Sequence, residues 1–136
     1  MFIQTKPIDI KLSIESKGKS LIAHLLFFNA THKRFYLDKH SICFDGKFTR
    51  NVFAIIDDHY AKVNYIGETV NRFIGPEEFI WLEVGEYVKT TVTINEGYKI
   101  KKGKRYIIQY SVYNLAYMSE QEVIRIESNK VAVIYQ

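Results

Sequence analysis

The sequence of residues 8–15 is IDIKLSIE, in which isoleucine or leucine at every even position alternates with a polar or charged residue. Successive side chains of a β-strand point to opposite faces, so this alternation predicts a strand with one buried face and one solvated face. A second stretch of the same kind, YIIQYSV, lies at residues 106–112. The two stretches together indicate a protein built from half-buried strands.

The rest of the chain repeats this pattern in short pieces, about eight in all at roughly ten-residue spacing, with turn residues such as Asp45-Gly46 between them. Isoleucine, valine and threonine number 35, whereas alanine, leucine and methionine number 15, and this balance favours strands over helices. No segment offers the long helical periodicity that a parallel sheet needs between its strands. The 136 residues are the size of one domain. We therefore expect an all-β fold, a single antiparallel β-sandwich of about seven to nine strands that spans residues 1–136.

Some segments depart from simple alternation. Residues 20–29 are almost continuously apolar, which predicts a central strand packed on both faces, with His24 as a core histidine. Phe79, Trp81 and Leu82 are expected to fill the core. Short extended pieces are predicted at residues 35–37, 42–44, 63–65, 123–126 and 131–135.

The charge balance is mildly basic, with 19 lysines and arginines against 15 acidic residues, a net charge of +4. This excess is compatible with an acidic partner, but it is a weak signal for nucleic acid, which we do not expect as a partner. The densest basic stretch, residues 99–105, is interleaved with tyrosine and isoleucine. It has two interpretations: a nucleic-acid groove, or a charged turn that prevents strand edges from aggregating, and the second is favoured.

The single cysteine, Cys43, lies in the apolar sequence SICF and is expected to be a buried, unreactive thiol. The first seven residues show no basic segment followed by an apolar leader. The longest apolar runs, residues 52–56 and 131–135, are too short to cross a bilayer. We therefore expect no membrane insertion and a cytoplasmic location, or a periplasmic or secreted one if a leader has been removed.

A family resemblance extends over most of residues 8–135. Its motifs, in order, are VNYIG (63–67), VNR (70–72), PEEF (76–79), LEVGE (82–86), Tyr98, GKRYIIQY (103–110) and IESNKVAV (126–133). Their order and spacing resemble the N-terminal domain of deuterolysin-like zinc endopeptidases of the peptidyl-Lys type. Val84 departs from the pattern, since the family has proline there, and the chain stops where the peptidase domain would begin.

The resemblance implies an immunoglobulin-like sandwich that stands free of the catalytic domain. Gly85 and Gly103 are expected in tight turns with positive φ. Tyr98 or Tyr106 is expected to fasten a corner of the sandwich through its hydroxyl, as tyrosine corners do. In the peptidases this domain precedes the catalytic domain and is associated with its folding and restraint.

No catalytic signature stands out. The His-Glu-x-x-His zinc motif is absent, and the four histidines, His24, His32, His40 and His59, show no metal-ligand spacing. We expect no catalytic residue, no metal and no cofactor. Asp57-Asp58-His59 and Glu77-Glu78 are interpreted as polar turns.

The segment NLAYM at residues 114–118 is unusually apolar for a surface loop. It either contacts a partner or folds back over one end of the sandwich. The candidate partner-binding residues are Tyr113, Leu115, Tyr117 and Met118.

The leading functional hypothesis is a non-catalytic protein-binding domain. The resemblance implies an inhibitor, or the immunity partner of a bacterial metallopeptidase toxin, which would place a loop or an edge strand in the substrate cleft. The alternative is a carbohydrate-binding or adhesion module, which would need exposed aromatic rings in a flat row. The oligomeric state is left open by the sequence.

Overall fold

The computed structural model describes residues 8–70, 75–114 and 124–136. In this part of the chain there are eight strands and four short 3₁₀ helices, labelled η. The strands are β1 (Asp9–Lys17), β2 (Ser20–Phe28), β3 (Phe35–Asp38), β4 (Phe53–Asp57), β5 (Phe79–Leu82), β6 (Tyr87–Thr93), β7 (Arg105–Asn114) and β8 (Ile124–Ile134). The 3₁₀ helices are η1 (Lys39–Ser41), η2 (Phe44–Gly46), η3 (Pro76–Glu78) and η4 (Ile94–Glu96).

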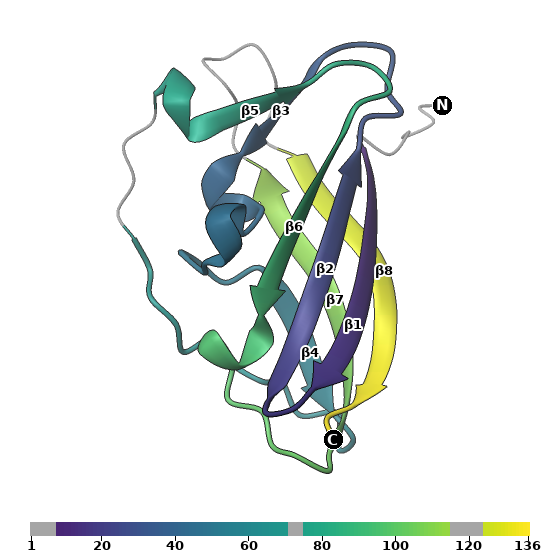
Figure 1. Cartoon of the computed structure of the whole chain (residues 1–136), viewed down its shortest axis with the longest axis vertical. Coiled ribbons are helices and arrows are strands. Elements are labelled where there is room, and N and C mark those ends of the chain that lie inside the picture. The colour runs from purple at the N-terminus through teal and green to yellow at the C-terminus, as the bar shows by residue number, and fades with distance from the viewer. Residues whose placement is uncertain (1–7, 71–74, 115–123) are drawn as a thin grey trace.

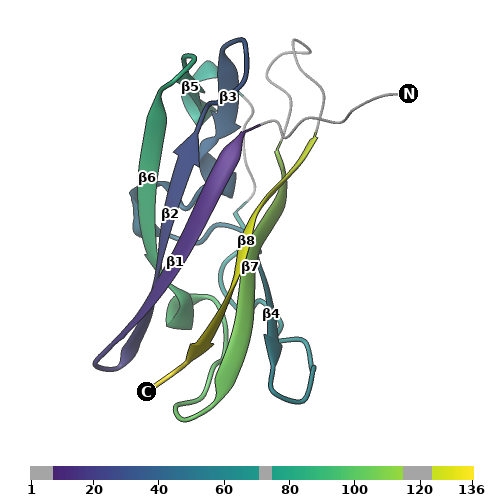
Figure 2. The same ribbon diagram turned by 90° about the vertical axis from the view of Figure 1, so that its right-hand side faces the viewer.

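The strands form two antiparallel three-stranded sheets that face each other, with strand orders β1-β2-β6 and β4-β7-β8. Figure 2 shows the two layers edge-on. A third, two-stranded sheet of β3 and β5 lies at one end of the molecule, drawn at the top of Figure 1. The all-β antiparallel sandwich expected from the sequence is confirmed.

The core lies between the two large sheets and follows the alternation of the sequence. Ile8, Ile10 and Leu12 are buried, and the charged residues between them are exposed. The second alternating stretch does the same from the opposite sheet, where Tyr106 and Ile108 are buried. The period-two pattern therefore gave the correct inward face for both strands.

Strand β2 corrects one expectation. It is central, between β1 and β6, but it is buried on one face: Leu21, Ala23, Leu25 and Phe27 point inward, and the residues between them are partly exposed. His24 is therefore not a core histidine. It lies on the outer face, where its ring nitrogens contact Glu15 Oε1 at 2.9 Å and Thr91 Oγ1 at 3.2 Å.

Other local expectations were wrong where a turn replaced a strand. Residues 42–44 are not extended, because Cys43 and Asp45 adopt positive φ and the chain forms η1 and η2 instead. Residues 63–65 contribute only an isolated bridge from Tyr65 to Tyr98 among the described pairs. By contrast, residues 124–126 and 131–134 are extended as expected, within one continuous strand, β8, which ends before Tyr135. Residue 123 lies outside the described residues.

The edge strands β1 and β8 lie side by side where the two sheets meet (Figures 1 and 2). Asn129 joins them: Leu12 N donates to its side-chain oxygen at 2.8 Å, and its amide nitrogen donates to Leu12 O at 3.1 Å. Asn129 can reach β1 because β8 has an irregularity there, where the register with β7 shifts between Gln109 and Ser111. We call this pair of hydrogen bonds the Asn129 clamp; it fixes the position of β1 in one sheet relative to β8 in the other.

Two tyrosines fasten the loops, as expected. The buried Tyr98 hydroxyl accepts hydrogen bonds from Val52 N at 3.0 Å and Phe53 N at 2.9 Å. The Tyr106 hydroxyl, at the start of β7, accepts from Lys101 N at 2.8 Å, five residues upstream. Burial raises the pKa of Tyr98 well above its usual value, so its hydroxyl stays protonated.

The two glycine turns also agree with expectation. Gly85 has φ of 84° and donates its N–H to Asn29 O at 2.9 Å. Gly103 has φ of 85° and donates to Tyr135 O at 2.5 Å. Both turns need the left-handed conformation that only glycine adopts without strain.

Candidate functional site

The β3–β5 sheet carries a cluster of large side chains near one end of the sandwich. In its antiparallel register Tyr36 lies opposite Trp81, and their rings meet edge to face with centroids 5.6 Å apart at an interplanar angle of 80°. Phe35 and Leu82, the neighbouring cross-strand pair, are buried against the core. Side chains of adjacent pairs point to opposite faces, so Tyr36 and Trp81 face away from the core.

Trp81 is 49% exposed, which corrects the expectation that it fills the core. Phe79 and Leu82, which were expected in the core with it, are buried. The sequence FIWL does not alternate cleanly, so its apolar composition alone suggested burial throughout. The outward position of Trp81 depends on its pairing with β3, which the sequence does not reveal.

Arg34 completes the cluster. Its guanidinium carbon lies 4.8 Å from the centre of the Trp81 ring, and its Nε donates to Glu83 Oε1 at 2.6 Å. Hydrogen bonds to Tyr36 and then to Glu83 raise the pKa of Arg34, which is charged in any case. We call Arg34, Tyr36, Trp81 and Glu83 the Trp81 cluster. It presents a stacked cation, two aromatic rings and a carboxylate to solvent.

The base of the β3–β5 sheet is fixed by a buried carboxylate. Asp38, at the end of β3, accepts from His40 N at 3.1 Å and from the Ser41 hydroxyl at 2.8 Å, and so caps η1. Arg50 in turn donates to the Ser41 hydroxyl at 3.1 Å. These bonds tie β3 to the chain that enters β4.

Two further contacts hold the β3–β5 sheet, one between the segments that flank it and one to the sandwich. His40 Nε2 lies 2.6 Å from Glu78 Oε2, which joins η1 after β3 to η3 before β5. The Asn114 side chain accepts from Asp38 N at 3.0 Å and donates to Tyr36 O at 2.9 Å, so the end of β7 bonds to the backbone of β3. The backbone that carries the Trp81 cluster is therefore fixed by the His40–Glu78 contact and by the hydrogen bonds of Asn114.

Of the contact residues expected from the sequence, Tyr113 lies in the described part of the chain. It sits near the end of β7, next to Asn114, and is 58% exposed. The Arg125 guanidinium lies 6.0 Å from its ring centre. Leu115, Tyr117 and Met118 lie outside the described residues.

Arg34, Tyr36 and Glu83 were not found by sequence reasoning. Each looks like an ordinary surface residue in the sequence, and only the β3–β5 register brings them beside Trp81. A cross-strand pairing of this kind has no fixed sequence spacing, so no motif could have marked it.

The histidines are distributed over separate places. His24 contacts Glu15, His40 contacts Glu78, and His59 contacts Asp58 at 3.7 Å. His32 precedes β3 and His40 follows it. Among the described residues, no group of three His, Cys, Asp or Glu side chains could hold a metal ion.

Cys43 is buried, as expected, and burial raises the pKa of its thiol to about 12. Asp57-Asp58-His59 forms a turn, as expected, in which the Ala61 and His59 N–H groups each donate to Asp57 Oδ1 at 2.9 Å. These hydrogen bonds lower the pKa of Asp57. Glu78 differs from the expectation of a fully solvated turn, because it is partly buried against His40.

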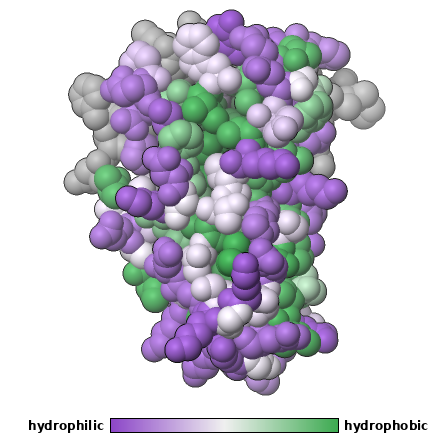
Figure 3. Space-filling view, in the orientation of Figure 1, coloured by the Kyte–Doolittle hydropathy of each residue, from purple (hydrophilic) through white to green (hydrophobic). Residues whose placement is uncertain are grey.

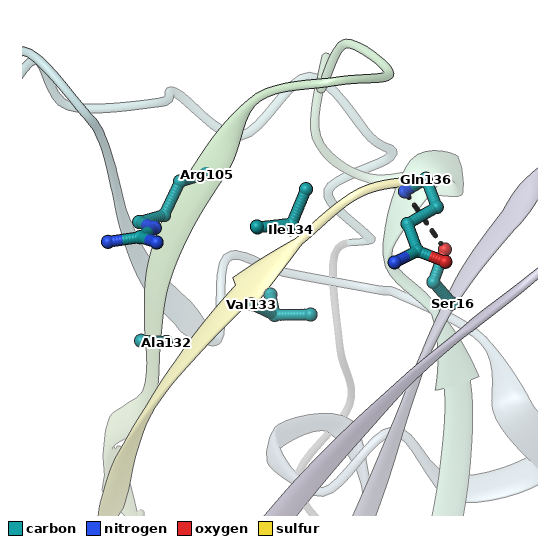
Figure 4. Close-up of a pocket in the computed structure, with 6 residues that line it drawn as sticks. All are labelled: Ser16, Arg105, Ala132, Val133, Ile134 and Gln136. Atoms are coloured by element: carbon teal, nitrogen blue, oxygen red, sulfur yellow. Dashed lines mark hydrogen bonds between the residues drawn. The ribbon is translucent and has the colours of Figure 1, made fainter.

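An open hollow of about 610 Å³ lies at the other end of the sandwich (Figure 4). It is lined by Ser16, Arg105, Ala132, Val133, Ile134 and Gln136. Its walls hold one cation and no acid or nucleophile paired with a base, so the hollow offers binding contacts but no chemistry.

No helix in the described part of the chain is long and apolar enough to span a membrane. In comparisons with known proteins, no family model matches the chain and no curated protein matches it.

Proposed function

We propose that the protein is a non-catalytic binding domain that holds another protein through the Trp81 cluster. One observation carries the proposal: an exposed tryptophan has an arginine over its ring and a tyrosine edge to face beside it, on a sheet held by side-chain hydrogen bonds. Tryptophan, tyrosine and arginine are the residues that most often dominate the energy of protein interfaces. A surface that is already ordered loses little entropy on binding.

The exposed side chains of this end support a mode of binding. Trp81 offers a partner an aromatic contact, and Arg34 and Glu83 beside it offer charged groups of both signs. Tyr113 lies in the same end of the molecule and would widen the contact.

The partner that we propose is a zinc metallopeptidase of the deuterolysin type, with this protein as its inhibitor or immunity partner. The sequence motifs carry this part of the proposal, and two features of the fold support it. The Tyr106 hydroxyl bonds to the backbone a few residues before its own strand, as in immunoglobulin-like tyrosine corners. The strand orders β1-β2-β6 and β4-β7-β8 are compatible with the two sheets of that fold.

The experiment is a titration of a deuterolysin-like peptidase with the purified protein, following both binding and peptide hydrolysis. We expect saturable binding and loss of hydrolysis. Trp81→Ala should weaken binding at least 30-fold, about 2 kcal/mol. Ile66→Ala, which also shortens an exposed apolar side chain, should change it less than threefold. Binding without loss of hydrolysis would refute inhibition, and absence of both would refute this choice of partner.

Carbohydrate binding is the second candidate, and the exposure of Trp81 favours it. The geometry favours it less, because Arg34 lies over the Trp81 ring and Tyr36 stands at 80° to it, so the two rings form no flat platform. Saturable binding on a glycan array that Trp81→Ala abolishes would support this alternative.

A further inference from the structure

The end of the sandwich opposite the Trp81 cluster gathers positive charge from separate parts of the chain. Lys17 ends β1 and Lys19 lies in the turn that follows it. Lys62 follows β4, and residues 101–104 lead into β7, which begins at Arg105. Figure 1 shows these turns together at its lower end. We call this set the cationic end: Lys17, Lys19, Lys62, Lys101, Lys102, Lys104 and Arg105.

Tyr135 holds the two lysine-bearing turns together. Its hydroxyl donates to Lys19 O in the first turn. Its backbone accepts from Gly103 N and donates to Lys104 O at 3.0 Å in the second turn. Asn95 adds to the junction, because its amide nitrogen donates to the Tyr135 hydroxyl at 2.8 Å and its side-chain oxygen accepts from Leu21 N at 2.7 Å. The lysines are therefore clustered by the fold, not by the sequence alone.

Much of this charge is not neutralised by nearby acids. Lys104 lies 3.8 Å from Asp57, and Asp58 contacts His59. Lys17, Lys19 and Lys101 are exposed, and none of them makes an ion pair among the described residues. Figure 3 shows hydrophilic residues covering the lower end of this face.

The exposed Tyr60 adds a second, independent feature. It is 82% exposed, and its φ of 61° is unusual for a bulky side chain. The Asp57 carboxylate holds this turn through the N–H groups of His59 and Ala61, as described above. A strained backbone that presents an aromatic ring to solvent is typical of a functional position.

The composition of this end indicates the class of partner. Six of its seven cations are lysines, which protein interfaces avoid, whereas lysine clusters are favoured on anionic lipid surfaces. Binding to single-stranded nucleic acid stacks successive bases on several aromatic rings. Of the tyrosines at this end, Tyr60 alone among the described residues is exposed, because Tyr98, Tyr106 and Tyr135 are buried with their hydroxyls bonded to the protein. Tyrosine is enriched where protein meets the interface of a bilayer.

We propose that the cationic end adsorbs reversibly onto an anionic phospholipid bilayer, with Tyr60 at the level of the headgroups and no segment inserted. The turns lie at the same end of the sandwich, so several lysines can approach a flat surface together. The long axis of the sandwich would then carry the Trp81 cluster away from the bilayer. This inference stands independently of the proposed protein partner.

The test is cosedimentation of the full chain with vesicles of phosphatidylcholine containing 30% phosphatidylserine, compared with phosphatidylcholine alone. We expect binding to the anionic vesicles only, and its loss at high ionic strength. Each lysine near such a surface contributes roughly fivefold in affinity, so the triple variant Lys17→Gln, Lys19→Gln, Lys101→Gln should bind about 100-fold more weakly. Tyr60→Ala should weaken binding by a smaller factor.

The matched control is the triple variant Lys11→Gln, Lys33→Gln, Lys47→Gln, which removes the same charge from exposed positions elsewhere. It should bind within about threefold of the native chain. Equal loss in the two triple variants would show that net charge alone acts, and would overturn the proposal. So would the absence of binding to anionic vesicles at low salt. Tighter binding to a single-stranded oligonucleotide than to these vesicles would replace the bilayer with nucleic acid.

Discussion

At the scale of single residues, asparagine side chains act as short pieces of backbone. Asn29, Asn95, Asn114 and Asn129, all in the described part of the chain, each bond to the main chain of a distant segment. A carboxamide carries the same kinds of donor and acceptor as a peptide group. It can therefore hydrogen-bond to the backbone of a strand at a point where that strand has no neighbouring strand. Each of these side chains therefore links two segments that are not joined by the backbone pairing of a sheet.

Tyr98 allows a prediction at this scale. Its hydroxyl accepts from two buried N–H groups at the start of β4 and donates to Asn51 Oδ1. Tyr98→Phe removes the acceptor and leaves both N–H groups without it, so we expect a loss of about 2–4 kcal/mol in the free energy of unfolding, measured with urea. Tyr60→Phe, at an 82% exposed residue, should change it by less than about 0.5 kcal/mol. A similar loss in the two variants would contradict this role for Tyr98.

At the scale of strands, the predictable part of the fold follows from alternation. Residues 8–15 and 106–112 revealed both their strand character and their inward faces, because one face of each strand is buried. β2 was misjudged because its outer face is also apolar, with Ile22, Leu26 and Phe28 only partly exposed. Composition cannot distinguish a half-exposed apolar face from a buried one.

The candidate site was less predictable than the strands. Tyr113 could be named from the sequence because it precedes an unusually apolar loop. The Trp81 cluster could not, since it depends on the pairing of two four-residue strands whose register is fixed by contacts such as Asn114 to β3. The cationic end could be predicted only in part. Residues 99–105 form a basic run in the sequence, but Lys17 and Lys19 are brought to the same end of the fold by the contacts of Tyr135.

The contact between strands β1 and β8 carries a second prediction. Asn129→Ala removes two hydrogen bonds to the Leu12 backbone at the line where the sheets meet. We expect a loss of about 1–3 kcal/mol in the free energy of unfolding and faster hydrogen exchange at the Leu12 amide. Asn64→Ala, at an exposed residue, is the control and should leave both unchanged. Unchanged exchange at Leu12 in Asn129→Ala would show that the clamp is not needed.

At the scale of the whole molecule, the two proposed surfaces lie at opposite ends of one rigid sandwich. The Trp81 cluster is held by Asp38 and Asn114, and the cationic end is held by Tyr135; these contacts involve different residues. Distant sites without shared partners usually behave additively. If both proposed surfaces bind, we expect the sandwich to act as a spacer that presents one surface while the other is engaged.

This separation predicts independence of the two binding events. The triple variant at Lys17, Lys19 and Lys101 should keep its affinity for the protein partner within about threefold, and Trp81→Ala should keep its affinity for anionic vesicles within the same limit. The peptidase should cosediment with anionic vesicles only when the native chain is present, and neither variant should recruit it. These outcomes can be measured in one vesicle sedimentation assay. If Trp81→Ala also weakened vesicle binding, or if the partner displaced the protein from vesicles, the two ends would be coupled and the spacer arrangement would be wrong.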